Sequence, residues 1–308
     1  MNSIVLNNIS KSYKNVQAVK NVSFNVEVGE LFGLIGPDGA GKTTIFRILT
    51  SLLLADSGSA TLMNFDVVKD FRNVRNIIGY MPGRFSLYQD LSVEENLSFF
   101  ATVFGTTIEE NYDLIKDIYI QIEPFKKRLA GKLSGGMKQK LALSCALIHK
   151  PEILILDEPT TGVDAVSRKE FWEMLKRLKQ KGITILVSTP YMDEAEICDR
   201  VALLQNGEVM QIDTPLNITK QFHKLLFAVK TDNMYLLINN LREYHDTFSV
   251  YPFGQIVHYT SISNSNNLAD LNVFLEKKGH KNIEIKAIEP NIEDCFMALM
   301  TTSQKNNA

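Results

Sequence analysis

The chain has 308 residues, of which 45% are hydrophobic and 22% are charged. This balance is typical of a folded globular protein and excludes a disordered chain, and the length favours about two domains. Lysine and arginine number 33 against 35 acidic residues, which leaves a formal net charge of -2. That charge disfavours a protein whose main task is to hold nucleic acid, because such proteins are usually basic.

The sequence contains no sign of a membrane span, a secretory signal or a cysteine framework. No apolar run approaches the roughly 20 residues that cross a bilayer, and residues 1–13 lack a basic stretch followed by an apolar one. The three cysteines are far apart, and the five histidines do not have metal-ligand spacing. We therefore expect a cytoplasmic protein with no direct membrane span.

The first part of the chain alternates short apolar runs with helical patterns, which predicts an α/β fold with a doubly wound sheet. The β-branched and leucine runs at 153–156 and 183–187 suit parallel strands that are buried on both faces. Ser92 and Glu95 form a capping box that begins a helix. In chain order, we expect antiparallel strands at 5–9 and 22–28, a strand at 31–35, helices at 44–49, after Ser92 and at 139–148, a strand at 153–156, a helix at 166–181, a strand at 183–187 and a hairpin at 201–212.

The pattern changes after Asp213-Thr214-Pro215, and the elements that follow have the order βαββαβ with a last helix. That order is typical of a ferredoxin-like α+β sandwich. We therefore predict one domain at 1–220 and a small C-terminal accessory domain at 221–308. The elements of the second domain are expected at 224–230, 232–242, 247–251, 255–261, 267–278 and 282–288, with the last helix from Asn291.

A glycine-rich loop after the strand at 31–35 fits the phosphate-binding pattern GxxxxGK[ST]. Glycines let backbone N–H groups wrap a phosphate, and the N-terminus of the following helix adds partial positive charge. Lys42 would bind the β- and γ-phosphates, and the hydroxyl of Thr43 would bind Mg²⁺. The candidate nucleotide-binding residues of this loop are Gly36, Pro37, Asp38, Gly39, Ala40, Gly41, Lys42, Thr43 and Thr44.

Two carboxylates, Asp157 and Glu158, follow the apolar strand at 153–156. The carboxyl end of a strand in a parallel sheet is where ligands bind. Asp157 can hold Mg²⁺ through water, and Glu158 can polarise the attacking water as a general base. We therefore predict that these carboxylates form the second half of a nucleotide-hydrolysing site.

Between the loop and the carboxylates lies a short segment, Leu133-Ser134-Gly135-Gly136-Met137-Lys138-Gln139, that leads into a helical stretch. The order and spacing of the three motifs resemble the ATP-binding cassette ATPases of ABC transporters over residues 1 to about 220. The chain is most similar to the ATPases of ABC-2-type exporters of drugs or other hydrophobic compounds. Their C-terminal domain resembles residues 224–300, including the ending at 289–296.

This resemblance implies a P-loop NTPase cassette with a RecA-like core, an antiparallel β subdomain and a helical subdomain at about 85–150. Tyr13 would stack on adenine, although a surface tyrosine at a strand end is the alternative. Residues 133–139 would cap the γ-phosphate of ATP bound to a partner subunit, and Gly162-Val163-Asp164 would cross the dimer interface. Segment 85–95 would contact a cytoplasmic helix of a transmembrane permease subunit.

The resemblance also implies ATP and Mg²⁺ as cofactors and a peripheral location on the cytoplasmic face of the cell membrane. Two ATP molecules would lie between two cassettes, and their hydrolysis would separate the cassettes. Closure and opening would then drive the permease between its inward-facing and outward-facing states.

Two positions depart from the family pattern. After residues 78–82 the family places a glutamine that touches Mg²⁺ and the attacking water, whereas this chain has Gly83. After residues 185–189 the family places a histidine that contacts the γ-phosphate, whereas this chain has Pro190. Neither residue has a side-chain donor, so we expect this chain's own site to bind ATP but to hydrolyse it poorly.

The intact Ser134-Gly135-Gly136 could still complete the site of a partner. This asymmetry resembles the degenerate first ATPase half of exporters that pair one degenerate cassette with one competent cassette. We therefore expect permease subunits and a second, different ATPase subunit as partners, and no nucleic acid. Two alternatives are a non-transport ABC ATPase that acts on ribosomes or DNA, and a regulatory subunit that binds ATP without turning it over.

Overall fold

In the computed structural model, which describes residues 1–263 and 268–306, the chain separates into two units, Met1–Thr214 and Pro215–Ala308. Residues 215–220, which we assigned to the first domain, group with the second unit. The predicted start of a helix at residue 267 lies outside the described residues. Within the described ranges, no helix is both long enough and apolar enough to span a membrane.

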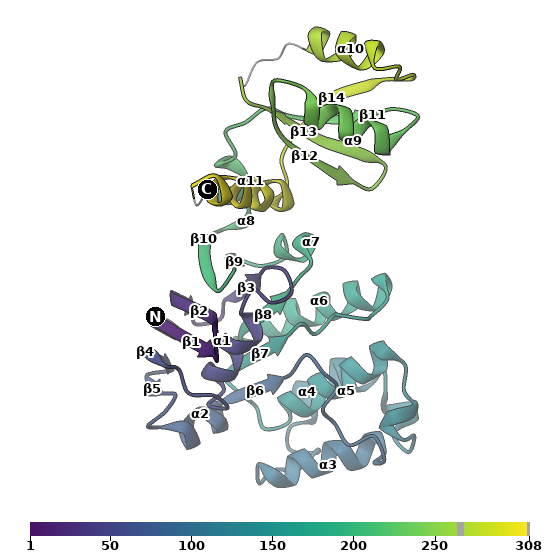
Figure 1. The fold of residues 1–308 in the computed structure, drawn as a ribbon. Helices are drawn as coiled ribbons and strands as arrows, with labels where there is room; N and C mark the ends of the chain where they lie inside the picture. The colour runs from purple at the N-terminus through teal and green to yellow at the C-terminus, as the bar shows by residue number, and fades with distance from the viewer. Residues whose placement is uncertain (264–267, 307–308) are drawn as a thin grey trace. The chain divides into compact units, whose positions relative to one another are not determined.

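A six-stranded sheet forms the centre of the first unit (Figure 1). Its strand order is β10-β9-β3-β8-β7-β6, and all neighbours are parallel except the hairpin pair β9 and β10. Every residue of the three central strands is buried, which confirms the prediction of a doubly wound α/β sheet. The strands are β3 (Leu31–Ile35), β6 (Ile78–Met81), β7 (Ile153–Asp157), β8 (Thr184–Thr189), β9 (Arg200–Gln205) and β10 (Glu208–Asp213).

A second sheet of the first unit is antiparallel and has the order β2-β1-β4-β5. Its apolar face shares one core with the helix that follows the phosphate-binding loop, and the rings of Phe24 and Phe32 stack at 5.4 Å in that core. The strand predicted at 5–9 is longer in the structure. Its full length was missed because a bulge at Asn8, with φ +51°, interrupts the alternation of apolar and polar residues. The elements are β1 (Asn2–Tyr13), β2 (Val16–Glu27), α1 (Lys42–Leu49), β4 (Ser57–Leu62), β5 (Phe65–Asp66) and α2 (Phe71–Ile77).

Helices between β6 and β7 pack together on the side of the sheet where β6 lies (Figure 1). The predicted capping box is confirmed, since the side chain of Ser92 accepts from the N–H of Glu95 and the carboxylate of Glu95 accepts from the N–H of Ser92. The helices of this part and of the following connections are α3 (Val93–Val103), α4 (Tyr112–Tyr119), α5 (Gly135–Leu147), α6 (Ala165–Gln180) and α7 (Met192–Ala195), with 3₁₀ turns at Glu123–Phe125 and Ala130–Lys132.

The second unit has one antiparallel sheet of order β12-β13-β11-β14. Its elements follow the order βαββαβ expected of a ferredoxin-like sandwich, and the core contains Phe227, Val257 and Leu275. The elements are α8 (Pro215–Lys220), β11 (Leu226–Lys230), α9 (Met234–Glu243), β12 (Thr247–Phe253), β13 (Ile256–Ser261), α10 (Leu268–Lys277), β14 (Glu284–Ile288) and α11 (Ile292–Asn306).

An ion pair between the half-buried Arg200 and the buried Glu30 fixes the start of β9 beside β3. The guanidinium of Arg200 contacts both carboxylate oxygens of Glu30 at 2.7 and 3.1 Å and donates to the carbonyl oxygen of Asn25 at 2.9 Å. Because Arg200→Ala leaves the buried Glu30 without its cation, we expect the free energy of unfolding to fall by about 2 kcal/mol. Denaturant titration measures this loss, and Lys176→Ala, which breaks an exposed pair, should cost much less. Equal losses of unfolding free energy from both variants would contradict the stabilising role of the Arg200–Glu30 pair.

Candidate nucleotide site

The phosphate-binding loop joins the end of β3 to the start of α1, and its glycines determine its path. Gly41 has φ +106° at the N-cap of α1, and a Cβ there would lie 2.4 Å from the carbonyl oxygen of Ala18. A Cβ on Gly36 would lie 2.2 Å from the carbonyl oxygen of Leu204. Larger residues are excluded at both ends of the loop, so its backbone can approach an anion at the helix N-terminus. Asp38 and Gly39 are exposed, Ala40 is buried, and Pro37, Thr43 and Thr44 are half-buried.

Lys42 is buried and holds the loop together from inside. Its Nζ donates to the carbonyl oxygens of Gly36 at 2.7 Å and Pro37 at 3.0 Å. The same Nζ lies 3.1 Å from Oε1 of Glu158, whose side chain is 20% exposed. A buried ammonium needs such partners because a desolvated charge is costly. The structure therefore joins the loop to the second predicted half of the site.

Asp157 is buried at the end of β7, and its Oδ1 accepts a hydrogen bond of 2.8 Å from Oγ of Ser188 on β8. Burial raises the pKa of Asp157, and hydrogen bonds from Ser188 and Thr43 oppose that rise. The two residues expected to bind Mg²⁺, Thr43 and Asp157, therefore lie near each other. Hydroxyl and carboxylate oxygens suit Mg²⁺, which completes its shell with phosphate oxygens and waters.

Glu158 has a strained backbone. Its φ of +48° lies in the left-handed region, which is uncommon for residues other than glycine. Its N–H is held by Oγ of Ser188 at 3.0 Å and by the carbonyl oxygen of Ser188 at 3.1 Å. In this conformation the carboxylate reaches Lys42, which places the candidate general base beside the phosphate-binding loop.

Both departures from the family pattern lie at the edge of this site. A Cβ on Gly83 would lie 3.1 Å from the carbonyl oxygen and 3.8 Å from Cγ of Asp157, so a longer side chain there would extend beside the carboxylates. Pro190 directly follows Thr189, the last residue of β8, whose carbonyl oxygen accepts a hydrogen bond of 3.4 Å from the N–H of Gly36.

Sequence analysis missed two polar residues that organise the site, Ser188 and Glu194. The carboxylate of Glu194 is buried, accepts hydrogen bonds from the hydroxyls of Thr160 and Thr189, and pairs with Nε of Arg168 at 3.0 Å. These contacts anchor the segments on both sides of Pro190. The signal for Ser188 was present in the sequence, since it is a polar residue at the end of a continuous apolar run.

Residues 133–139, which we call the signature segment, begin α5 with an exposed helix N-terminus. Ser134 is the N-cap, and its Oγ accepts a hydrogen bond of 3.3 Å from the N–H of Met137. Ser134 and Gly135 are exposed, so the first N–H groups of α5 can face an anion outside this chain. A Cβ on Gly136 would lie 2.8 Å from Oγ of Ser167, so α5 approaches α6 closely there. Leu133 is buried, and Gly136, Met137, Lys138 and Gln139 are half-buried.

The predicted interface segment Gly162-Val163-Asp164 lies next to the signature segment. A Cβ on Gly135 would be 3.7 Å from the carbonyl oxygen of Gly162, which is exposed and has φ +74°. Asp164 is the N-cap of α6, and hydrogen bonds from Ser167 lower the pKa of its carboxyl. The two segments expected to meet a partner therefore share one surface.

Tyr13 is exposed at the end of β1, where it pairs with Val16 at the start of β2. The same strand β2 carries Ala18, whose carbonyl oxygen lies against Gly41. Tyr13 is therefore on the hairpin that borders the phosphate-binding loop, and its contact with adenine stays a prediction.

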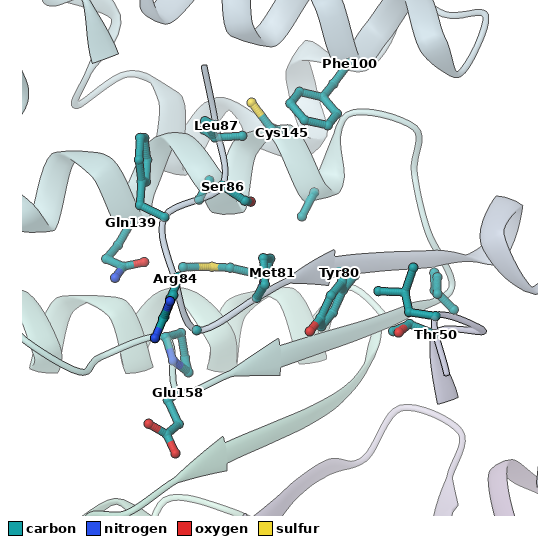
Figure 2. Close-up of a pocket in the computed structure, with 18 of the residues that line it drawn as sticks. Thr50, Tyr80, Met81, Arg84, Ser86, Leu87, Phe100, Gln139, Cys145 and Glu158 are labelled. Carbon is teal, nitrogen blue, oxygen red and sulfur yellow. The ribbon is translucent and has the colours of Figure 1, made fainter. Parts of the chain in front are cut away.

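An apolar cavity of about 350 Å³ lies next to the carboxylates and was not predicted (Figure 2). Figure 2 shows Tyr80 and Met81 on β6, Phe100 on α3 and Cys145 on α5 around it, with Glu158 at one end. Segment 83–87 runs along the cavity, so the region expected to contact a permease begins there. The residues that line the cavity come from five separate stretches of sequence, which is why no local pattern revealed it.

Known proteins are similar to this chain. The family profile described as ABC transporter matches residues 19–161. The probable multidrug ABC transporter ATP-binding protein YbhF of Escherichia coli (strain K12) is 44% identical over 221 residues, which is 70% of this chain and 38% of YbhF. The chain therefore spans well under half the length of that relative.

Two other relatives are covered more fully. The linearmycin resistance ATP-binding protein LnrL of Bacillus subtilis (strain 168) is 36% identical over 68% of this chain and 69% of its own length. The Nod factor export ATP-binding protein I of Sinorhizobium fredii (strain NBRC 101917 / NGR234) is 34% identical over 99% of this chain and 88% of its own length.

Solved structures have the same fold over most of this chain. An ATP-binding subunit of an ABC transporter aligns with a TM-score of 0.65 and 29% identity over 71% of this chain and 92% of its own. The dimeric cassette MJ0796, bound to ADP and Pi in a post-hydrolysis state, aligns with a TM-score of 0.62 and 27% identity over 68% of this chain and 98% of its own. Given these relatives and the geometry of the loop and carboxylates, the chain belongs to the ATP-binding proteins of the ABC transporter family.

Proposed function

We propose that this chain is the ATP-binding subunit that powers an ABC-2-type exporter of drugs or other hydrophobic compounds. The observation that carries the proposal is the convergence of Lys42, Thr43, Asp157 and Glu158 at the carboxyl end of one parallel sheet. Relatives named for multidrug transport, linearmycin resistance and Nod factor export support the exporter class.

ATP binding has to rearrange the contacts of Lys42. Its ammonium now pairs with Glu158 and two loop carbonyls, whereas the β- and γ-phosphates carry more charge and accept shorter hydrogen bonds. Transfer of the ammonium to the phosphates releases the carboxylate of Glu158, which can then accept a proton from the attacking water. Mg²⁺, held by Thr43 and Asp157, would offset the charge that develops on the phosphates.

A second cassette completes each site in this proposal. The exposed N-terminus of α5 at Ser134 would cap the γ-phosphate of ATP bound to the partner, next to the interface segment at Gly162. Permease subunits would dock where segment 85–95 meets the apolar cavity, on the cytoplasmic face of the membrane.

Hydrolysis in this chain's own site should be slow. Gly83 lies against Asp157 but has no side chain to orient water or Mg²⁺, and Pro190 has no donor for the γ-phosphate. A pair of identical cassettes would therefore contain two impaired sites, so we propose a different, competent cassette as the partner. The same two positions favour a regulatory subunit as the second candidate, and the retained Glu158 favours turnover.

Measurements on the purified chain test the proposal. We expect tight ATP binding with little hydrolysis, and faster turnover after a permease and a competent second cassette are added. Export of a hydrophobic compound by the reconstituted complex would support the exporter class. Rapid hydrolysis by the isolated chain, lost in Glu158→Gln, would overturn the impaired-site proposal.

Restoring the missing side chains should speed the isolated chain. We expect Gly83→Gln combined with Pro190→His to raise the ATPase rate by about a hundredfold, the typical effect of one well-placed polar group on a transition state. Gly83 does not have a positive φ, and its nearest neighbour, at 3.1 Å, requires only a small shift. The matched control is Gly83→Ala combined with Pro190→Ala, which changes the backbone but adds no donor. Equal rates for both variants would show that another feature limits hydrolysis.

A further inference from the structure

A basic and apolar hollow of about 730 Å³ on the first unit has no part in the proposed catalytic site. Its cationic side chains are exposed, and its two large apolar side chains are 36% and 38% exposed. We call these residues the basic–apolar surface: Phe125, Lys126, Lys127, Arg128, Leu129 and Lys132.

Most of the positive charge on this surface lacks an anionic partner. Lys126 lies 3.3 Å from Glu94, and both side chains are exposed. In the part of the chain that the structure describes, Lys127, Arg128 and Lys132 form no ion pair with an acidic side chain. The whole chain has a net charge of -2, so this local excess does not reflect its overall composition. These unpaired cations favour the binding of an anionic partner.

The acidic residue that lines the hollow, Glu123, forms no ion pair with these cations among the described residues. The carboxylate of Glu123 accepts a hydrogen bond of 3.0 Å from the hydroxyl of Tyr112. The guanidinium of Arg128 lies over the ring of Phe125 at 4.5 Å, which keeps a cation and an aromatic face together at the surface.

Backbone hydrogen bonds join the basic–apolar surface to the segment that we expect to meet the permease. The N–H of Glu94 donates to the carbonyl oxygen of Lys126 at 3.0 Å. The N–H of Val93 donates to the carbonyl oxygen of Arg128, also at 3.0 Å. The two segments therefore lie side by side, and a permease contact at 85–95 would bring the basic–apolar surface close to the membrane.

We propose that the basic–apolar surface binds the anionic phospholipid headgroups of the membrane around the permease. Clusters of lysine and arginine attract anionic bilayers, and exposed aromatic and leucine side chains insert at the level of the headgroups. An acidic protein segment would satisfy the cations but would leave the exposed Phe125 and Leu129 unexplained. The proposal rests on the proposed function only for the orientation of this surface toward the bilayer.

Vesicle sedimentation tests the proposal with the full purified chain, without nucleotide or permease. The chain should bind vesicles of phosphatidylcholine mixed with phosphatidylglycerol, should not bind phosphatidylcholine alone, and should dissociate as salt is raised. The triple variant Lys127→Gln, Arg128→Gln, Lys132→Gln should bind about a hundredfold more weakly, since each cation near an anionic bilayer contributes about a factor of five.

A matched variant removes the same charge from elsewhere in the first unit. Lys69→Gln, Arg72→Gln and Lys176→Gln change exposed cations away from the hollow, so this protein should bind vesicles like the wild type. Phe125→Ser should weaken binding without altering its salt dependence, and circular dichroism should show that every variant is folded.

Three results would overturn the lipid proposal. The first is no binding of the wild type to anionic vesicles, and the second is equal binding by the two triple variants. The third is that the first triple variant binds vesicles like the wild type but no longer associates with a purified permease in detergent. The third result would assign the surface to an acidic protein segment. ATP binding is measured separately on the same proteins. Absence of ATP binding by the wild-type chain would count against the proposed function alone.

Discussion

Lys42→Ala should abolish ATP binding and leave the fold intact. The lysine supplies the one buried ammonium in contact with the phosphate-binding loop among the described residues. Its loss removes charge-assisted hydrogen bonds to two phosphates, which should weaken binding by about 3 kcal/mol or more, or at least about a hundredfold. Isothermal titration with ATP and Mg²⁺ measures the effect.

The control for this variant is Lys181→Ala, which removes an exposed lysine paired with Asp117. It should bind ATP like the wild type. Because Lys42→Ala also leaves Glu158 without its cation, thermal unfolding should be compared for both variants. A folded Lys42→Ala protein with unchanged affinity would show that nucleotide does not bind at this loop.

Ser134→Arg should stop transport by the complete complex, whereas Glu158→Gln should have a smaller effect. In the proposed complex, Ser134 would act on ATP held by a competent partner, where we expect most turnover to take place. Loss of one hydrogen bond to a charged oxygen costs about 1.5–3 kcal/mol, and the bulk of arginine also displaces the cap. Glu158→Gln would instead disable a site that we expect to be slow already. ATPase rate and export are measured for each variant in one complex.

Among the signature positions, Ser134 is the cleaner one to change. Its side chain is exposed, whereas any side chain at Gly136 would meet Ser167 at 2.8 Å and disturb the packing of α5 on α6. Gly136→Asp should therefore stop transport and also lower stability. Complete loss of ATPase activity in Glu158→Gln would show that this chain's own site turns over, and the asymmetric mechanism would be wrong.

Local sequence signals located the elements that build the candidate site. The phosphate-binding loop fits a pattern with fixed spacing. The apolar runs of β7 and β8 are typical of strands that are buried on both faces of a parallel sheet. The hairpin at Asn206-Gly207 is confirmed, since both residues have positive φ, as a tight turn requires.

Contacts between residues that are far apart in the chain could not be predicted from the sequence. The pair of Lys42 with Glu158, the approach of Gly83 to Asp157 and the packing of α5 on α6 depend on how strands and helices are placed in three dimensions. Hydrophobic periodicity reports which face of an element is buried and does not identify the element that covers it. The apolar cavity and the basic–apolar surface were missed for the same reason.

The left-handed backbone at Glu158 lowers the stability of the fold, whereas the proposed chemistry needs a carboxylate at that position. A non-glycine residue in this conformation costs about 1–2 kcal/mol, and asparagine or glycine would fit the same backbone with less strain. Selection for a sturdier fold alone would therefore replace the carboxylate, and a cassette that had given up turnover would gain stability from that change. The strained glutamate at this position is therefore expected only if its carboxylate takes part in the proton transfer that we propose for this site.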